Sequence, residues 1–147
     1  MADPVVLERP RLGRLYVRLR GPLDAATGAL LCAALREALA VTGDVTEVVL
    51  DLRAVDDVTA GHAALLAAQS LIARAGLRSA HIVARPRVRG LVMRVCHELD
   101  DPGARPVPSE AMAEAWLARH DVLGFADASF DQAERLLAGL RGRGVDV

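Results

Sequence analysis

The sequence predicts an α/β domain: a mixed β-sheet with an antiparallel start and parallel strands after it, and four helices packed on it. Three observations support this class. A stretch near the start alternates apolar and polar residues, two later stretches are short continuous apolar runs, and segments with helical periodicity separate them. Strands that alternate with helices of this length indicate βαβ units with right-handed crossovers.

The first two strands are expected to form an antiparallel pair at the edge of the sheet. Residues 5–7 form a short apolar run, and residues 12–20 place Leu15, Val17 and Leu19 on one face of a half-buried strand. Residues 9–13 would join the two strands. The Gly21-Pro22 pair is expected to end the second strand.

The remaining elements follow from periodicity and from capping residues. In the first helix, the apolar spacing predicts that Leu30, Leu31 and Leu35 face inward. Continuous apolar runs are typical of interior strands that are covered on both faces. The expected order is a helix over 25–39 capped by Asp24, a strand over 48–52, a loop over 54–59, a helix over 60–75, a strand over 79–84, a helix over 88–99, an extended piece over 106–108, and a helix over 110–119 capped by Ser109.

The C-terminal part of the sequence has a looser pattern. Residues 1–119 are expected to form the domain, and residues 120–147 a C-terminal appendage made of a loop and a helix. The appendage helix is expected over residues 130–140, because Leu136, Leu137 and Leu140 give it an apolar side.

Charge and composition exclude several classes of partner. The net charge is −1, from 18 basic residues, all of them arginine, and 19 acidic residues. This balance gives no general attraction to nucleic acid or to anionic lipid, so neither is expected as a partner. The start lacks the features of a signal peptide, and no apolar stretch approaches the ~20 residues of a membrane span. A cytoplasmic protein is therefore expected.

No cofactor, metal site or catalytic site is expected from the sequence. Cys32 and Cys96 lie far apart in apolar surroundings, which favours buried reduced thiols. There is no Gly-x-Gly-x-x-Gly or Walker pattern for a nucleotide. A small α/β enzyme with its site at the loops after the strands is the alternative, but no convergent set of nucleophile, base or metal ligands is readable. The histidines are scattered, at positions 62, 81, 97 and 120.

Several motifs together resemble one family. Residues 21–27, Gly-Pro-Leu-Asp-Ala-Ala-Thr, are similar to the opening of STAS domains, and residues 48–52 to their central strand. Residues 61–66, Gly-His-Ala-Ala-Leu-Leu, resemble the start of their second helix. The third helix after Pro86 and the closing strand and helix from Pro106 match as well, so the resemblance runs from about Val5 to about Arg119.

The resemblance to STAS domains of the anti-sigma-factor-antagonist type implies a regulatory binding module that is not an enzyme. In such proteins, the partner is a serine-protein kinase that also serves as the anti-sigma factor. The unmodified antagonist binds the kinase and frees the sigma factor, and phosphorylation of a Ser or Thr before the second helix breaks that complex. A homodimer is left open as a further association.

Matched residue by residue, the resemblance places the modifiable hydroxyl at Thr59. Ala60 stands at the second hydroxyl position and Val58 where Asp is usual, in a loop one residue shorter than the family norm, so Asp57 is the substitute for the missing Asp. Asp51 is expected to end its strand near this loop. The residues assigned to partner binding and the switch loop are Asp24, Asp56, Asp57, Val58, Thr59, Ala60, Gly61 and His62.

Three alternatives stay open at this point. Thr59 could act only as a cap of the following helix, which is worth ~1 kcal/mol. The chain could be a degenerate STAS module in a signalling assembly without a phosphoswitch. The arginines at the start of the third helix could form a solvated face or meet an acidic partner. This last group is Arg85, Arg87, Arg89 and Arg94.

Overall fold

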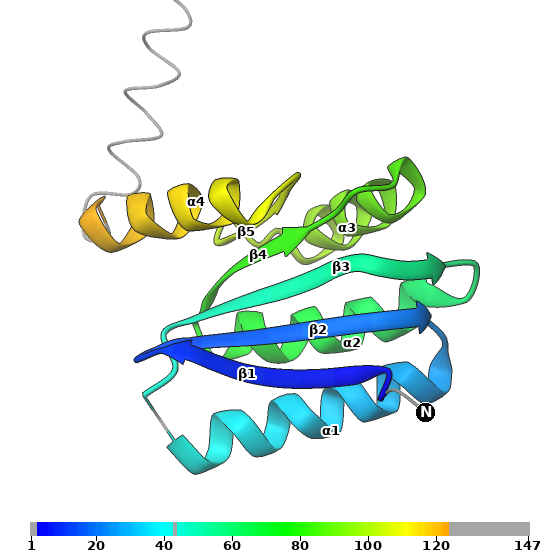
Figure 1. The fold of residues 1–147 in the computed structure, drawn as a ribbon, viewed down its shortest axis with the longest axis horizontal. Helices are drawn as coiled ribbons and strands as arrows, with labels where there is room; N and C mark the ends of the chain where they lie inside the picture. The colour runs from blue at the N-terminus through cyan, green and yellow to red at the C-terminus, as the bar shows by residue number, and fades with distance from the viewer. Residues whose placement is uncertain (1–2, 43, 124–147) are drawn as a thin grey trace, which may run out of the picture. The chain divides into compact units, whose positions relative to one another are not determined.

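The computed structural model describes residues 3–42 and 44–123, and within them the predicted mixed sheet and four helices are confirmed (Figure 1). The strands form one sheet in the order β1-β2-β3-β4-β5, with β1 antiparallel to β2 and each later neighbour parallel. The elements are β1 (Val5–Arg11), β2 (Arg14–Pro22), α1 (Ala25–Thr42), β3 (Glu47–Asp57), α2 (Gly61–Arg74), β4 (Arg78–Ile82), α3 (Pro86–Leu99), β5 (Ala104–Val107) and α4 (Glu110–Leu123).

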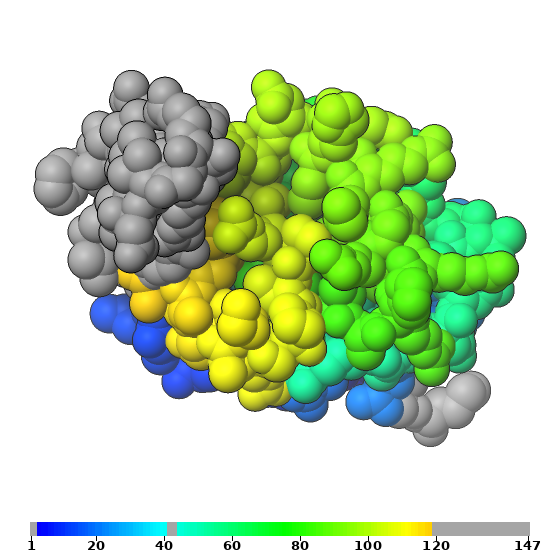
Figure 2. Space-filling model, turned by 90° about the horizontal axis from the view of Figure 1, so that it is seen from above, coloured from blue at the N-terminus to red at the C-terminus, as the bar shows by residue number. Residues whose placement is uncertain are grey.

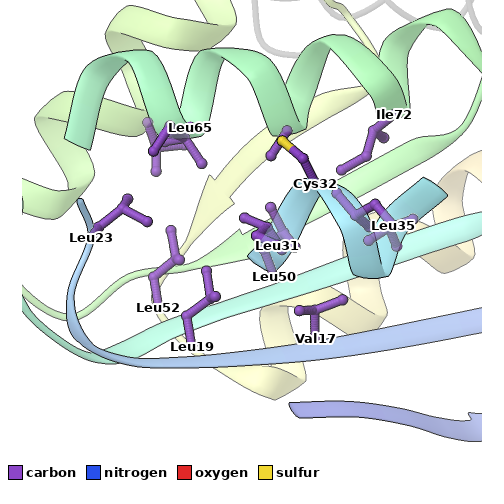
Figure 3. Close-up of a cluster of buried hydrophobic side chains, with 14 of the residues drawn as sticks. Val17, Leu19, Leu23, Leu31, Cys32, Leu35, Leu50, Leu52, Leu65 and Ile72 are labelled. Atoms are coloured by element: carbon purple, nitrogen blue, oxygen red, sulfur yellow. The ribbon is translucent and has the colours of Figure 1, made fainter. Parts of the chain in front are cut away.

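One face of the sheet is covered by α1, α2 and α3. Leucine and valine make up most of this core, and Figure 3 shows Leu31 and Leu35 of α1 between the sheet and Ile72 of α2. The two helices approach closely at Gly28 and Ala64: a Cβ atom added to Gly28 would lie 2.5 Å from the Cβ of Ala64. A glycine is therefore required where α1 crosses α2.

The other face carries a smaller core under α4. Side chains alternate across a strand, and in β3 Val48 packs in the first core while Val49 packs in the second. Ala113 and Leu117 of α4 are buried here. Two-sided burial explains why β3 reads as a continuous apolar run.

Strand β3 is longer than predicted. The sequence placed a strand over 48–52 and a loop over 54–59, whereas β3 continues to Asp57. Its pairing with β4 ends at Asp51, and beyond that point it pairs only with β2. The last residues of β3 are therefore mostly exposed, and their charges hide the strand from a search for apolar runs.

The two predicted helix caps are confirmed, but the predicted burial of Leu30 is wrong. The backbone N–H of Thr27 donates to Oδ1 of Asp24 at 2.9 Å, and that of Met112 donates to Oγ of Ser109 at 3.2 Å. Leu30 was predicted to face inward and is 52% exposed, because α1 buries the neighbouring face that carries Leu31 and Leu35.

The predicted appendage falls mostly outside the described residues. The loop after residue 123 and the helix over 130–140 are not described, so the boundary at residue 119 stays a prediction. Helix α4 itself continues to Leu123, beyond the expected end at residue 119. In the part of the chain that is described, no helix combines the length and hydropathy needed to cross a membrane.

Candidate functional site

The candidate site is the turn between β3 and α2, at the carboxyl end of β3. The backbone N–H of Leu23 donates to the carbonyl of Asp57 at 2.8 Å, which ties the segment leading to Asp24 beside this turn. A Cβ atom at Gly61 would lie 3.1 Å from Cδ2 of Leu91 and 3.2 Å from the Leu23 carbonyl oxygen. The glycine therefore lets the start of α2 sit close against α3 and the β2–α1 segment.

Thr59 is exposed at the tip of this turn. Its backbone N–H donates to Oδ1 of Asp57 at 2.9 Å, and the N–H of Gly61 closes the turn on the carbonyl of Val58 at 3.0 Å. Hydrogen bonds from the side chain and then the backbone of Thr59 hold the pKa of the Asp57 carboxyl below its ordinary value. The turn thus presents a hydroxyl group to solvent with a carboxylate directly beside it.

Thr59 is not the cap of α2, so the capping-only interpretation is wrong as stated. The N-cap of α2 is Ala60, which has no side-chain oxygen, and α2 begins at Gly61. Thr59 lies one residue before the N-cap. Its hydroxyl therefore has no capping role in the first turn of α2. The structural contacts of Thr59 at this turn are those with Asp57.

The first turn of α2 is tied to the end of α3 through His62. Nε2 of His62 lies 2.9 Å from a carboxylate oxygen of Glu98, and Nε of Arg94 donates to the same carboxylate at 3.1 Å. His62 and then Arg94 keep the pKa of the Glu98 carboxyl below its ordinary value. Of the other predicted site residues, Asp56 is exposed and Val58 is half-buried.

A cavity of about 350 Å³ separates the turn from the start of α3. Asp56, Asp57 and Val58 line one side, and the residues from Arg85 to Val88 line the other. Nη1 of Arg85 donates to the carbonyl of Val55 at 3.0 Å. The charge of Arg87 contributes to the lowered pKa of Asp57.

Arg85 and Arg87 are therefore site residues that the sequence-based assignment missed. The signal was their position directly after β4. The carboxyl ends of neighbouring parallel strands meet at one edge of a sheet, so the segment after β4 lies beside the segment after β3.

Asp51 was expected to end its strand near this turn, and that expectation is wrong. It lies in the middle of β3 on the side of α4, where its carboxylate accepts bonds from Tyr16 and Arg53, each at 2.7 Å. Burial by itself would raise the pKa of Asp51, but these bonds lower it below its ordinary value. Burial, and then the bond to Asp51, raises the pKa of Tyr16 to about 12. Asp51 is thus part of a polar network that joins the sheet to α4 at Glu110.

The described residues include neither a metal-binding cluster nor an activated cysteine. Among residues 3–42 and 44–123, no group of three or more His, Cys, Asp and Glu side chains could hold a metal ion. Cys32 and Cys96 are both free thiols, as predicted, although Cys96 is only partly buried. Burial raises the pKa of the Cys96 thiol to about 11, so at neutral pH the thiol is protonated and a poor nucleophile.

Solved structures similar to this one share its architecture. SpoIIAA in its unphosphorylated form is 16% identical, with 78% of this chain and 97% of that chain covered and a TM-score of 0.58. The phosphorylated form of the Bacillus cell fate determinant SpoIIAA is 19% identical, with 77% and 98% covered and a TM-score of 0.56. The chain has the fold of the SpoIIAA anti-sigma-factor antagonists.

A third match agrees with the same assignment. An anti-sigma-factor antagonist from Mycobacterium paratuberculosis is 18% identical, with 76% of this chain and 90% of that chain covered and a TM-score of 0.52. The STAS-like fold expected from the sequence motifs is thereby confirmed. No protein-family model matches the sequence, and no curated protein does.

Proposed function

We propose that this chain is a cytoplasmic regulatory module of the anti-sigma-factor-antagonist type, which binds a serine-protein kinase acting as anti-sigma factor and is not itself an enzyme. The observation that carries the proposal is the exposed hydroxyl of Thr59 on the β3–α2 turn of a SpoIIAA-like fold. The same fold is matched in SpoIIAA with and without phosphate. The partner surface consists of the turn from Asp56 to His62 together with the neighbouring residue Asp24.

Phosphorylation of Thr59 would act through charge rather than through the core. Thr59 is exposed, so a phosphate group displaces no buried side chain. It adds a charge of about −1.5 to −2 beside the carboxylates of Asp56 and Asp57. A partner surface that accepts the neutral hydroxyl would then meet a concentrated negative charge, and binding would weaken.

A second candidate is a STAS-like module that binds a partner without a phosphoswitch. The observation that favours it is Val58, which stands where the resembled family has Asp, in a loop one residue shorter. Asp57 compensates in part for the missing Asp at position 58, because its carboxylate accepts a hydrogen bond from the backbone N–H of Thr59. The two candidates differ in whether a negative charge at position 59 changes affinity.

The test compares the affinity of wild type, Thr59→Ala and Thr59→Asp for a kinase captured with the wild-type chain from native lysate. We expect Thr59→Ala to bind within about threefold of wild type. Thr59→Asp should bind at least about tenfold more weakly, a loss of ~1.4 kcal/mol, because it places a charge in the contact surface. Isothermal titration calorimetry on folded protein gives the affinities.

Ala33→Asp is the matched control, because Ala33 is an exposed residue of α1 away from the turn. It should bind like wild type. Equal affinity for all the variants, with no phosphate found on Thr59 by mass spectrometry after incubation with the kinase and ATP, would exclude the phosphoswitch and leave the second candidate. Failure to capture any kinase would count against the first candidate.

A further inference from the structure

A second cavity lies at the same edge of the sheet, on the other side of Arg85. Its volume is about 600 Å³, within the range of ligand-binding clefts. It separates α3 from the segment that leads from β5 into α4, and Figure 2 shows this face, with green residues of α3 beside yellow residues of β5 and α4. The lining residues are Val83, Ala84, Arg85, Pro86, Arg89, Gly90, Met93, Pro106, Val107 and Pro108.

The cavity forms a groove between α3 and the segment that follows β5. Arg89 and Met93 are about one turn apart on the same side of α3, and Arg85, the N-cap residue, precedes them, so the three residues span roughly 12 Å. The opposite wall is the extended segment from Pro106 to Pro108. This length accommodates about four residues of an extended peptide.

The groove is walled by apolar side chains and lined with positive charge. Met93 is 52% exposed and faces prolines and Val107 across the groove. Arg85 and Arg89 are the charged lining residues, and the lining includes no carboxylate. The guanidinium of Arg85 bonds to a neutral carbonyl, that of Val55, so its charge is not neutralised there.

We propose that this groove binds an extended acidic peptide segment of a partner protein. Two carboxylates of the segment pair with Arg85 and Arg89, and an apolar side chain beyond the second carboxylate packs against Met93 and the Pro106–Pro108 wall. Proline lacks the N–H needed to extend a sheet, so the segment is held by side-chain contacts rather than as an added strand. Thr59 is not part of the lining, and this surface adjoins the proposed switch site through Arg85, which lines both cavities.

The test is an NMR titration of the ¹⁵N-labelled full chain. The probe is an acetylated, amidated heptapeptide of four glutamates alternating with three leucines. The comparison peptide has glutamine in place of each glutamate. We expect saturable shifts of the amides of Arg89, Gly90 and Met93 with the acidic peptide, and an affinity at least about tenfold higher than that of the glutamine peptide.

Two variants of the groove make the test specific. Gly90→Leu fills it: a Cβ atom at Gly90 meets nothing within 4 Å, so the new side chain enters the groove without disturbing the core. Arg89→Glu reverses one of its charges. Each variant should weaken the acidic peptide at least about tenfold, whereas Arg36→Glu, on the exposed side of α1, should change it by less than about twofold.

Binding by wild type that both groove variants weaken at least about tenfold, and that Arg36→Glu keeps, supports the proposal. Three results would overturn it: no saturable binding of the acidic peptide, equal binding of the glutamine peptide, or unchanged affinity of Gly90→Leu. None of these measurements involves a kinase or Thr59, so the outcome is independent of the proposed function.

Discussion

Two helical glycines have opposite surroundings. Gly28 of α1 touches α2, and an added Cβ atom would overlap the Cβ of Ala64. Gly90 of α3 faces open space, where an added Cβ atom meets nothing within 4 Å. Glycine costs a helix roughly 1 kcal/mol relative to alanine, so the first glycine is kept for packing and the second has no packing reason.

The two glycines should respond to alanine with opposite signs. Gly28→Ala is expected to lower the free energy of unfolding by ~1–3 kcal/mol, because α1 and α2 must move apart. Gly90→Ala is expected to raise it by ~0.5–1 kcal/mol. Urea unfolding followed by circular dichroism measures both values.

Adding Ala64→Gly to Gly28→Ala serves as the control for the contact. It removes the methyl group that the new Cβ atom meets, so the double variant should lose less than the sum of the two single losses. Additive losses would show that the close approach of Gly28 and Ala64 is not the cause.

At the scale of elements, a local sequence pattern predicts a helix or strand correctly where the burial of its side chains follows from that pattern alone. Leu15, Val17 and Leu19 alternate and are fully buried, as predicted for β2. The end of β3 could not be predicted in this way, because Ala54 and Asp57 pair with β2 after β4 has already ended. Which strands run side by side is not encoded in the local pattern.

The candidate site shows the same limit. Thr59 and Asp57 were assigned because they lie just before residues 61–66, whose resemblance to the second helix of STAS domains fixes their positions. Arg85 and Arg87 come from a different crossover, and only the order of the parallel strands brings them to the same edge. The interpretation of Thr59 as a cap failed by one residue, because helix boundaries are the least certain part of a pattern.

Helix α4 should depend on its apolar contact with the sheet. Leu117 is fully buried in the smaller core, so Leu117→Ala should lower the free energy of unfolding by ~2–5 kcal/mol. Met112 belongs to the same helix and is 51% exposed, so Met112→Ala should change it by less than ~0.5 kcal/mol. Similar losses from both variants, measured by thermal unfolding, would mean that α4 does not pack on the sheet through Leu117.

On the scale of the whole molecule, the large core contains a polar cluster that the apolar patterns did not reveal. Nε2 of His81 lies 2.9 Å from Oε1 of Gln69, whose amide nitrogen donates to Ser79 at 3.1 Å and to Asp101 at 3.0 Å. The cluster joins α2, β4 and the segment after α3. Burial lowers the pKa of His81 from 6.5 to about 4, so the imidazole is neutral at neutral pH.

This cluster predicts acid sensitivity of the fold. Between pH 6.5 and about 4, the unfolded chain takes up a proton at His81 and the folded chain does not. The free energy of unfolding should therefore fall as the pH drops through this window, by up to ~3 kcal/mol, and it should be constant in this respect above pH 6.5.

The measurement is the free energy of unfolding at several pH values between 4 and 7. His81→Gln keeps a polar side chain but cannot titrate, so its pH slope should be smaller than that of wild type. His97→Gln, at an exposed position of α3, should keep the wild-type slope. A slope unchanged in His81→Gln would assign the acid sensitivity to other groups.

The contact between Gly28 and Ala64 also bears on how a signal could leave the β3–α2 turn. Two helices that touch at backbone distance cannot slide past one another without first separating, and α2 is the helix that begins at this turn. A modification of Thr59 would therefore meet resistance to any shift of α2 against α1. The charge of the phosphate would then act on the partner directly, through the electrostatic field at the surface. Mutations that change how phosphorylation alters partner affinity would therefore be expected in the contact surface and not in the core.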